Sequence, residues 1–272
     1  MNVLLATFLA IRPRILNPKS GDEFDSSLLS AFVLRIFGAR RLEPAEDTLK
    51  DEKSPQISLG ARLSAYRNES GQRRPDFAKA YDELVERLDI IDRGEVGPRL
   101  GESMPRFDLP DENGQLISLP SLLRSGPVVI SINRGHWCPY CKLDLRSLAD
   151  IHDEIEQLGA QAISIMPDSA QFTDGYVARN GLPFPVLSDI DLGYSLSLGL
   201  IFWVGDEIQT LYREAGVELE KYHGNQGHFL PMAAKFIVGR DGLVKTRQVN
   251  TEFRERMEPE AIIAALSELR ES

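Results

Sequence analysis

The feature that most constrains this chain is a run of β-branched residues that leads directly into a pair of cysteines. Residues 128–134 read VVISINR, a composition typical of a buried central strand. Cys138 and Cys141 follow in the tetrad CPYC, and apolar residues then recur at helical spacing. Pro139 suits the first position of a helix, where its missing N–H is not needed. We therefore expect a buried strand that ends at a helix N-terminus, with Cys138 at the junction.

A cysteine at that junction has the properties of a reactive thiol. The unpaired N–H groups and the positive dipole end of the helix stabilise an anion, so they lower the pKa of a thiol placed there. Residues three apart in a helix have Cβ atoms roughly 5–6 Å apart, whereas a disulfide needs roughly 3.5–4.5 Å. A bond between Cys138 and Cys141 is therefore expected to form and break. We interpret the pair as a redox centre in which Cys138 attacks.

These two cysteines are the only ones among the 272 residues of the chain. They cannot build a disulfide framework, and they leave Cys141 as the one resolving thiol that the chain itself supplies. Two other interpretations stay open: a pair of buried structural thiols, and a zinc site completed by His223 and His228, which form an H-x-x-x-x-H pair. The redox interpretation requires neither a metal nor a cofactor, and we expect none.

Charge and hydropathy exclude some classes of function. The formal net charge of −10 argues against nucleic acid as a partner. No apolar run reaches the roughly 18 residues of a membrane span, and the opening MNVLLATFLAIRPRIL has no basic segment before its apolar stretch, which argues against a secretory signal. We expect a cytoplasmic protein, with organelle targeting left open by Arg12, Arg14 and Lys19.

The chain divides into three parts by composition. Residues 1–57 predict an N-terminal extension, part of it polar enough to be disordered. Residues 58–98 predict a helical lead-in, because apolar residues recur at helical spacing over 76–92. Residues 99–272 alternate strands and helices, the pattern of an α/β three-layer domain. The elements expected there are a hairpin around Asn113-Gly114, strands over 128–134, 162–166 and 184–189, helices over 141–158, 171–181 and 192–200, a hairpin around Asp241-Gly242, and a helix over 259–270.

Four segments in order resemble the peroxiredoxin (AhpC/TSA, redoxin) family of the thioredoxin-fold superfamily. They are GESMPRFDLPDENGQLISL, the WCPYC junction, LPFPVLSDIDLGYSLSLGL and LPMAAKFIVGRDGLV. The chain is most similar to a subgroup with an RG-x-WCPYC motif. The resemblance implies a thioredoxin-like α/β/α sandwich with a mixed central sheet, preceded here by a helical N-terminal extension.

The resemblance also implies an activity, that of a thiol-dependent peroxidase acting on hydrogen peroxide or alkyl hydroperoxides. The thiolate of Cys138 would become a sulfenic acid, and Cys141 would condense with it to a disulfide. Thioredoxin, glutaredoxin or glutathione would then reduce the pair. No nucleic acid or membrane partner is expected, and the sequence permits a homodimer.

The chain departs from the family at the position three residues before the attacking cysteine. The family has Thr or Ser there, and this chain has Gly135. The arginine that the family places near the thiolate is also missing from its usual place, where Lys235 is the candidate cation. Arg134, His136 and Trp137 complete the candidate site as a cation, a proton carrier and a packing residue.

The departures keep two alternative functions open. One is a thioredoxin- or glutaredoxin-like thiol–disulfide oxidoreductase, in which the same cysteine attacks sulfur instead of oxygen. The other is a non-catalytic zinc-binding or scaffold domain.

Overall fold

The structure is a computed structural model, and it describes residues 57–92 and 96–271. The predicted N-terminal extension lies outside the described residues, except for Ile57. Within the part of the chain that is described, no helix combines the length and the apolarity needed to cross a membrane.

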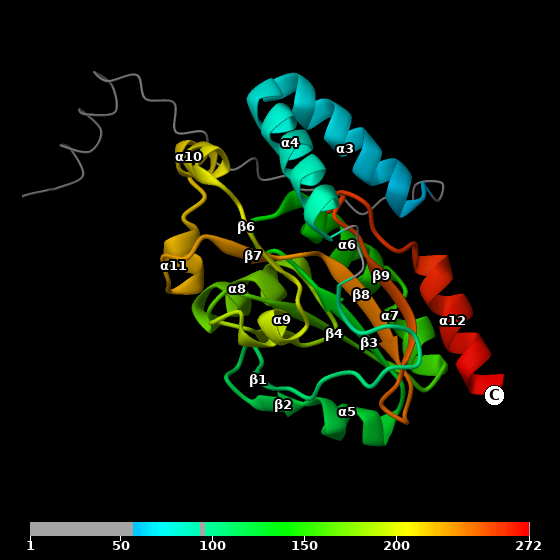
Figure 1. Cartoon of the computed structure of the whole chain (residues 1–272). Helices are drawn as coiled ribbons and strands as arrows, with labels where there is room; N and C mark the ends of the chain where they lie inside the picture. The colour runs from blue at the N-terminus through cyan, green and yellow to red at the C-terminus, as the bar shows by residue number, and fades with distance from the viewer. Residues whose placement is uncertain (1–56, 93–95, 272) are drawn as a thin grey trace, which may run out of the picture. The chain divides into compact units, whose positions relative to one another are not determined.

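The central sheet is mixed and has five strands in the order β5-β4-β3-β8-β9 (Figure 1). β3, β4 and β5 are parallel, β8 pairs antiparallel with β3, and β9 pairs antiparallel with β8 at the edge of the sheet. The predicted β-branched strand is β3 at the centre, and all five of its residues are buried. The strands are β3 (Val128–Ile132), β4 (Gln161–Met166), β5 (Val186–Ser188), β8 (Ala234–Val238) and β9 (Val244–Val249).

Apolar residues cover both faces of the sheet, which confirms the predicted three-layer α/β/α sandwich. Because side chains alternate along a strand, Val129 packs into one hydrophobic cluster and Ile130 into the other. The first cluster contains residues of α6 (Pro139–Asp150), α7 (His152–Gln157), α8 (Ala170–Asn180) and α12 (Pro259–Glu271).

Several local predictions are confirmed. Asn113-Gly114 lies in the turn between β1 (Asp108–Pro110) and β2 (Leu116–Ser118), which pair antiparallel. Gly114 adopts φ +79°, a conformation that glycine tolerates best. Asp241-Gly242 lies in the turn between β8 and β9. Gly181 closes α8 in the left-handed conformation.

One predicted helix is two helices in the structure. The apolar spacing over 141–158 predicts a single helix, but α6 ends at Asp150 and α7 begins at His152. The break lies at Ile151, whose ψ is 11°. Helical periodicity survives a single non-helical residue, so the pattern of side chains does not reveal the break.

The helical lead-in consists of two helices, of which the sequence predicts only the second. That helix is α4, which is amphipathic, whereas only Leu59 and Leu63 of α3 are buried. The remaining short elements were not predicted, with the exception of α9. The bounds of these elements are α3 (Leu59–Arg73), α4 (Pro75–Asp92), α5 (Leu119–Ser125), α9 (Gly193–Ser197), β6 (Ile201–Trp203), α10 (Asp206–Glu214), α11 (Leu219–His223) and β7 (Phe229–Pro231).

The connection between β9 and α12 holds the two lead-in helices in place (Figure 1). The carboxylate of Glu258 accepts hydrogen bonds from the first N–H groups of α3, those of Leu59 at 2.9 Å and Gly60 at 2.8 Å. Arg254 pairs with Asp82 of α4 at 2.7 Å. These contacts place α3 against α6, the helix that carries the cysteine pair.

Candidate functional site

The two cysteines lie at the junction that the sequence predicts. β3 ends at Ile132, and Cys138 is the N-cap residue of α6, with its carbonyl accepting from the Lys142 N–H at 3.0 Å. Both thiols are free in this structure. Cys138 is 1 % exposed and Cys141 is fully buried. The thiol of Cys138, predicted to attack, is therefore enclosed.

The surroundings of Cys138 favour its thiolate. Burial raises the pKa of this thiol, but a hydrogen bond from the Cys141 thiol and the charges of Arg134 and Arg256 outweigh burial and lower its pKa to about 6. Burial and the neighbouring Cys138 raise the pKa of Cys141 well above its ordinary value. At neutral pH the first cysteine is thus mainly a thiolate and the second is a protonated donor.

Arg134 is a buried cation with an aromatic environment. It is 1 % exposed, and its guanidinium lies 3.8 Å from the ring centroid of Phe253 and 5.5 Å from that of Trp137. Its Nη2 donates to the hydroxyl of Tyr212 at 2.5 Å, and its Nε has no hydrogen-bond partner among the described residues. The Arg134 main-chain N–H donates to Cys141 Sγ at 3.4 Å. Arg134, predicted from its position at the strand end, therefore lies at the thiols.

Arg256 is a second cation at the site, and sequence reasoning missed it. Its Nη2 lies 3.7 Å from Cys141 Sγ, although the two residues are 115 positions apart. Its Nε lies 3.8 Å from Asp144 Oδ2. The arginine comes from the connection between β9 and α12, where it follows no motif, so no local signal could have identified it.

Lys235 is buried near the site but is already paired. Its Nζ lies 2.7 Å from Asp144 Oδ1, one turn beyond Cys141 on α6. Ser131, which faces Lys235 across β3 and β8, donates to the other carboxylate oxygen at 3.2 Å. The structure thus places Lys235 in an ion pair beneath the site, and the arginines supply the cations at the thiols.

His136 and the loop before Cys138 are held by a buried carboxylate. The His136 N–H donates to Asp168 Oδ2 at 2.8 Å, and its Nδ1 lies 3.2 Å from Oδ1. The imidazole stacks on Phe172 with ring centroids 5.4 Å apart and meets Tyr222 edge-on at 4.7 Å. These contacts fix the direction of the loop. They do not place the imidazole against either sulfur.

Gly135 is required by the shape of this loop. It adopts φ +141°, and a Cβ built on it would lie 2.5 Å from Trp137 Nε1 and 3.0 Å from Asp168 Oδ2. A threonine or serine cannot occupy that space without moving Trp137. The loop thus excludes a side chain at position 135, because Trp137 packs where that side chain would stand.

The zinc arrangement considered from the sequence does not form. His223 is buried, with Nε2 4.0 Å from Asp168 Oδ1, and burial lowers its pKa. His228 pairs with Glu220 at 3.0 Å. Across residues 57–92 and 96–271 no group of three or more histidines, cysteines and carboxylates is arranged to hold a metal ion.

Comparison with known proteins identifies the family. The model of the AhpC/TSA family matches residues 100–247, which is more than half of the chain. The chain belongs to the AhpC/TSA family. Its relatives include the chloroplastic peroxiredoxin Q of Sedum lineare, 29 % identical over 89 residues, which are 33 % of this chain and 47 % of that protein. Peroxiredoxin Bcp of Escherichia coli is 26 % identical over 93 residues, which are 34 % of this chain and 59 % of that protein.

These matches are partial, since the chain spans about half of the length of the curated relatives it matches. Among solved structures, the peroxidoxin BcpB of Mycobacterium tuberculosis has 19 % sequence identity and a TM-score of 0.49. That match covers 63 % of this chain and 97 % of the other. The family match includes β3, the cysteine pair and β8, and it ends before the segment that contributes Arg256.

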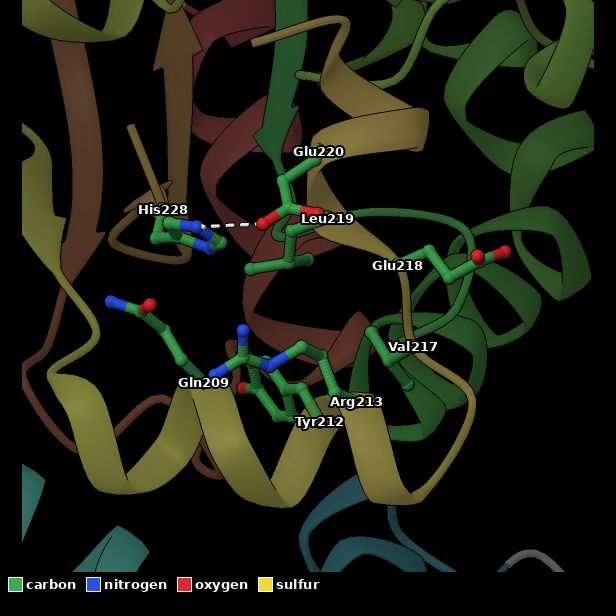
Figure 2. Close-up of a pocket in the computed structure, with 8 residues that line it drawn as sticks. All are labelled: Gln209, Tyr212, Arg213, Val217, Glu218, Leu219, Glu220 and His228. Atoms are coloured by element: carbon green, nitrogen blue, oxygen red, sulfur yellow. Dashed lines mark ion pairs between the residues drawn. The ribbon is translucent and has the colours of Figure 1, made fainter. Parts of the chain in front are cut away.

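A cavity of about 210 Å³ shares one residue with the surroundings of the cysteines (Figure 2). It is lined by α10, α11 and the segments next to them. Tyr212 belongs to its wall, and this is the residue whose hydroxyl accepts from Arg134. The volume exceeds that of a single water, and Tyr212 connects the wall of the cavity to the buried arginine.

Proposed function

We propose that this AhpC/TSA chain is a thiol-dependent peroxidase that reduces hydrogen peroxide or alkyl hydroperoxides through Cys138 and Cys141. The observation that carries the proposal is the charge around Cys138. Two arginines and a protonated neighbouring thiol lower its pKa to about 6 although the sulfur is buried. A thiolate at neutral pH, enclosed with cations, is what attack on an O–O bond requires.

The reaction balances with the groups at hand. Cys138 sulfur forms a bond to the terminal peroxide oxygen, the O–O bond breaks, and the remaining oxygen leaves with the electron pair and takes up a proton to become water or an alcohol. The product is a sulfenic acid on Cys138. Cys141 sulfur then attacks Cys138 sulfur, hydroxide leaves and combines with the Cys141 proton, and a disulfide remains.

Reduction of that disulfide completes the cycle and belongs to the proposal. Thioredoxin, glutaredoxin or glutathione is the proposed reductant, in the cytoplasm, and the enzyme is proposed to act as a monomer or homodimer. Membership of the RG-x-WCPYC subgroup, with a lead-in over residues 58–98 and a redoxin domain over 99–272, is part of the same proposal. Because Cys138 and Cys141 are buried and α3 packs on α6, a protein reductant requires a local opening that exposes the disulfide.

The test is the rate at which Cys138 is oxidised. Hydrogen peroxide and an alkyl hydroperoxide are mixed with the reduced protein in a stopped-flow instrument, and Trp137 fluorescence follows the reaction. We expect second-order rate constants at least about a hundredfold above that of free cysteine at the same pH, and none of this signal in Cys138→Ser. A rate equal to that of free cysteine would exclude the peroxidase.

The second candidate is a thiol–disulfide oxidoreductase. It is favoured by the spacing of Cys138 and Cys141, which suits dithiol exchange, and by the absence of a hydroxyl at Gly135. The same protein is therefore tested for reduction of insulin and of a mixed glutathione disulfide. Rapid disulfide reduction without rapid peroxide reduction would establish this alternative.

A resolving role for Cys141 is tested separately. In Cys141→Ser we expect the first oxidation to proceed and the protein to accumulate as a sulfenic acid or mixed disulfide, detectable by a dimedone adduct and its mass. Continuous turnover at the wild-type rate with a dithiol reductant would remove Cys141 from the mechanism.

A further inference from the structure

Two buried donor groups lie near Cys138, and one of them has no hydrogen-bond partner among the described residues. That one is the Nε–H of Arg134. The other is the hydroxyl of Tyr212, whose oxygen accepts from Arg134 Nη2 at 2.5 Å and from the Tyr81 hydroxyl at 3.3 Å. A buried donor without an acceptor destabilises the folded protein. Such a donor next to a reactive thiol calls for a functional reason.

Both donors belong to the surroundings of the thiolate. The charge of Arg134 lowers the pKa of Cys138, and Cys138 in turn is among the groups that raise the pKa of Tyr212. The ring of Tyr212 meets that of Trp137 edge-on with centroids 5.0 Å apart, and Trp137 directly precedes Cys138. Burial is the largest of the effects that raise the pKa of Tyr212, so the hydroxyl keeps its proton at neutral pH.

Tyr212 also lines the cavity of about 210 Å³ (Figure 2). Its ring and Leu219 are buried parts of the wall, whereas Arg213, Glu218 and Glu220 are exposed. The cavity therefore extends from an exposed rim to the residue that bonds to Arg134. Tyr212 is the one lining residue that contacts the arginine of the thiol site.

We propose that Tyr212 is a catalytic residue of the peroxidase reaction, and that its hydroxyl and the Nε–H of Arg134 together bind the peroxide and stabilise its leaving oxygen. The inference rests on the proposed function. In this arrangement Tyr212, 77 positions beyond Gly135 in the sequence, supplies the hydroxyl that a threonine or serine at position 135 would otherwise provide.

The proton transfer in this step balances. As the sulfur of Cys138 bonds to the terminal oxygen and the O–O bond breaks, the leaving oxygen takes the electron pair of that bond and the proton of Tyr212. Water or alcohol is released, and the phenolate that remains is stabilised by the guanidinium of Arg134 until a proton from solvent restores it. That proton replaces the one which Cys138 released when it ionised.

The test compares two reactions of the same thiolate in Tyr212→Phe. This variant keeps the ring that packs on Trp137 and removes only the hydroxyl. We expect the rate of oxidation by hydrogen peroxide and by tert-butyl hydroperoxide to fall by about a hundredfold, the usual contribution of a positioned donor or general acid. Alkylation of Cys138 by iodoacetamide needs no such donor, and we expect its rate to change by less than about threefold.

Tyr81→Phe is the matched control, because it removes the neighbouring hydroxyl 3.3 Å away while Arg134 keeps its bond to Tyr212. Its peroxide rate should stay within about threefold of wild type. Difluorotyrosine in place of Tyr212 keeps the hydroxyl and the fold, and it should retain at least about a tenth of the wild-type rate.

Two results would overturn the inference. One is a Tyr212→Phe peroxide rate within about threefold of wild type, and the other is an equal loss in the peroxide and alkylation rates, which would mean a structural role. If wild type itself reacts with peroxide no faster than free cysteine, the proposed function fails as well, and that outcome is read from wild type alone.

Discussion

Gly135 stands where the resemblance to the family leads us to expect Thr or Ser, and replacing it provides a quantitative test of the loop. We predict that Gly135→Thr, which restores the family's hydroxyl, lowers both stability and peroxide reactivity. The backbone conformation at φ +141° is unfavourable for a residue with a Cβ, by about 1–3 kcal/mol. The contact at 2.5 Å with Trp137 Nε1 requires that side chain to move, which adds about 1–3 kcal/mol.

The sum, roughly 2–6 kcal/mol, is a large fraction of the ~5–15 kcal/mol that stabilises a typical domain. For a chain of this size it corresponds to a fall in Tm of roughly 10 °C. The displaced Trp137 would also disturb Cys138, its neighbour, so the peroxide rate should fall with the stability. Urea unfolding and stopped-flow oxidation measure the two effects.

Gly114→Ala is the control for the cost of placing a residue with a Cβ at a positive φ. Gly114 also has a positive φ, +79°, but a Cβ on it meets nothing within 4 Å. The free energy of unfolding of Gly114→Ala should therefore fall by only about 1 kcal/mol, and its rate of reaction with peroxide should not change. A Gly135→Thr protein that unfolds at the wild-type urea concentration and reacts faster with peroxide would refute the argument from the loop.

Three further predictions address the charges of the site and the helix that packs on α6. The rate of alkylation of Cys138 should rise with pH and reach half its maximum near pH 6, because the pKa of this thiol is about 6. Arg256→Met should move that midpoint to higher pH, since it removes a cation that favours the thiolate. Lys235→Met should destabilise the fold by up to about 3–5 kcal/mol, because it leaves the buried carboxylate of Asp144 with only Arg256, at 3.8 Å, as a cation. Adding Asp144→Asn should recover much of the loss in urea unfolding. Glu258→Ala should destabilise the start of α3 by about 1–2 kcal/mol, because it removes the acceptor for the first N–H groups of the helix. Hydrogen exchange in α3 and alkylation of Cys138 should then both become faster. Unchanged hydrogen exchange would contradict the capping role.

Prediction from sequence succeeded where one signal dominates locally. The β-branched run 128–134 indicated the central strand, and Asn113-Gly114 and Asp241-Gly242 indicated hairpin turns that the structure contains. It failed where local signals are weak or interrupted. α3 buries only two apolar residues, and the break at Ile151 leaves the helical periodicity on either side intact.

Some residues of the candidate site could likewise be predicted from the local sequence, and others could not. The position of Cys138 at a helix start and of Arg134 at the strand end follow from neighbouring residues. The roles of Lys235 and Arg256 do not, because each depends on which charge another segment brings close. Asp144 pairs with the lysine at 2.7 Å, and the arginine reaches Cys141 from 115 positions away.

The amino-acid sequence by itself determined that a buried strand runs into a CxxC helix start within an α/β fold, since propensity and periodicity are properties of adjacent residues. Only the tertiary structure decided how the thiolate is stabilised and why position 135 has no side chain. The field at a buried sulfur depends on through-space distances between β3, α10 and the connection before α12, and those distances exist only after the chain has folded.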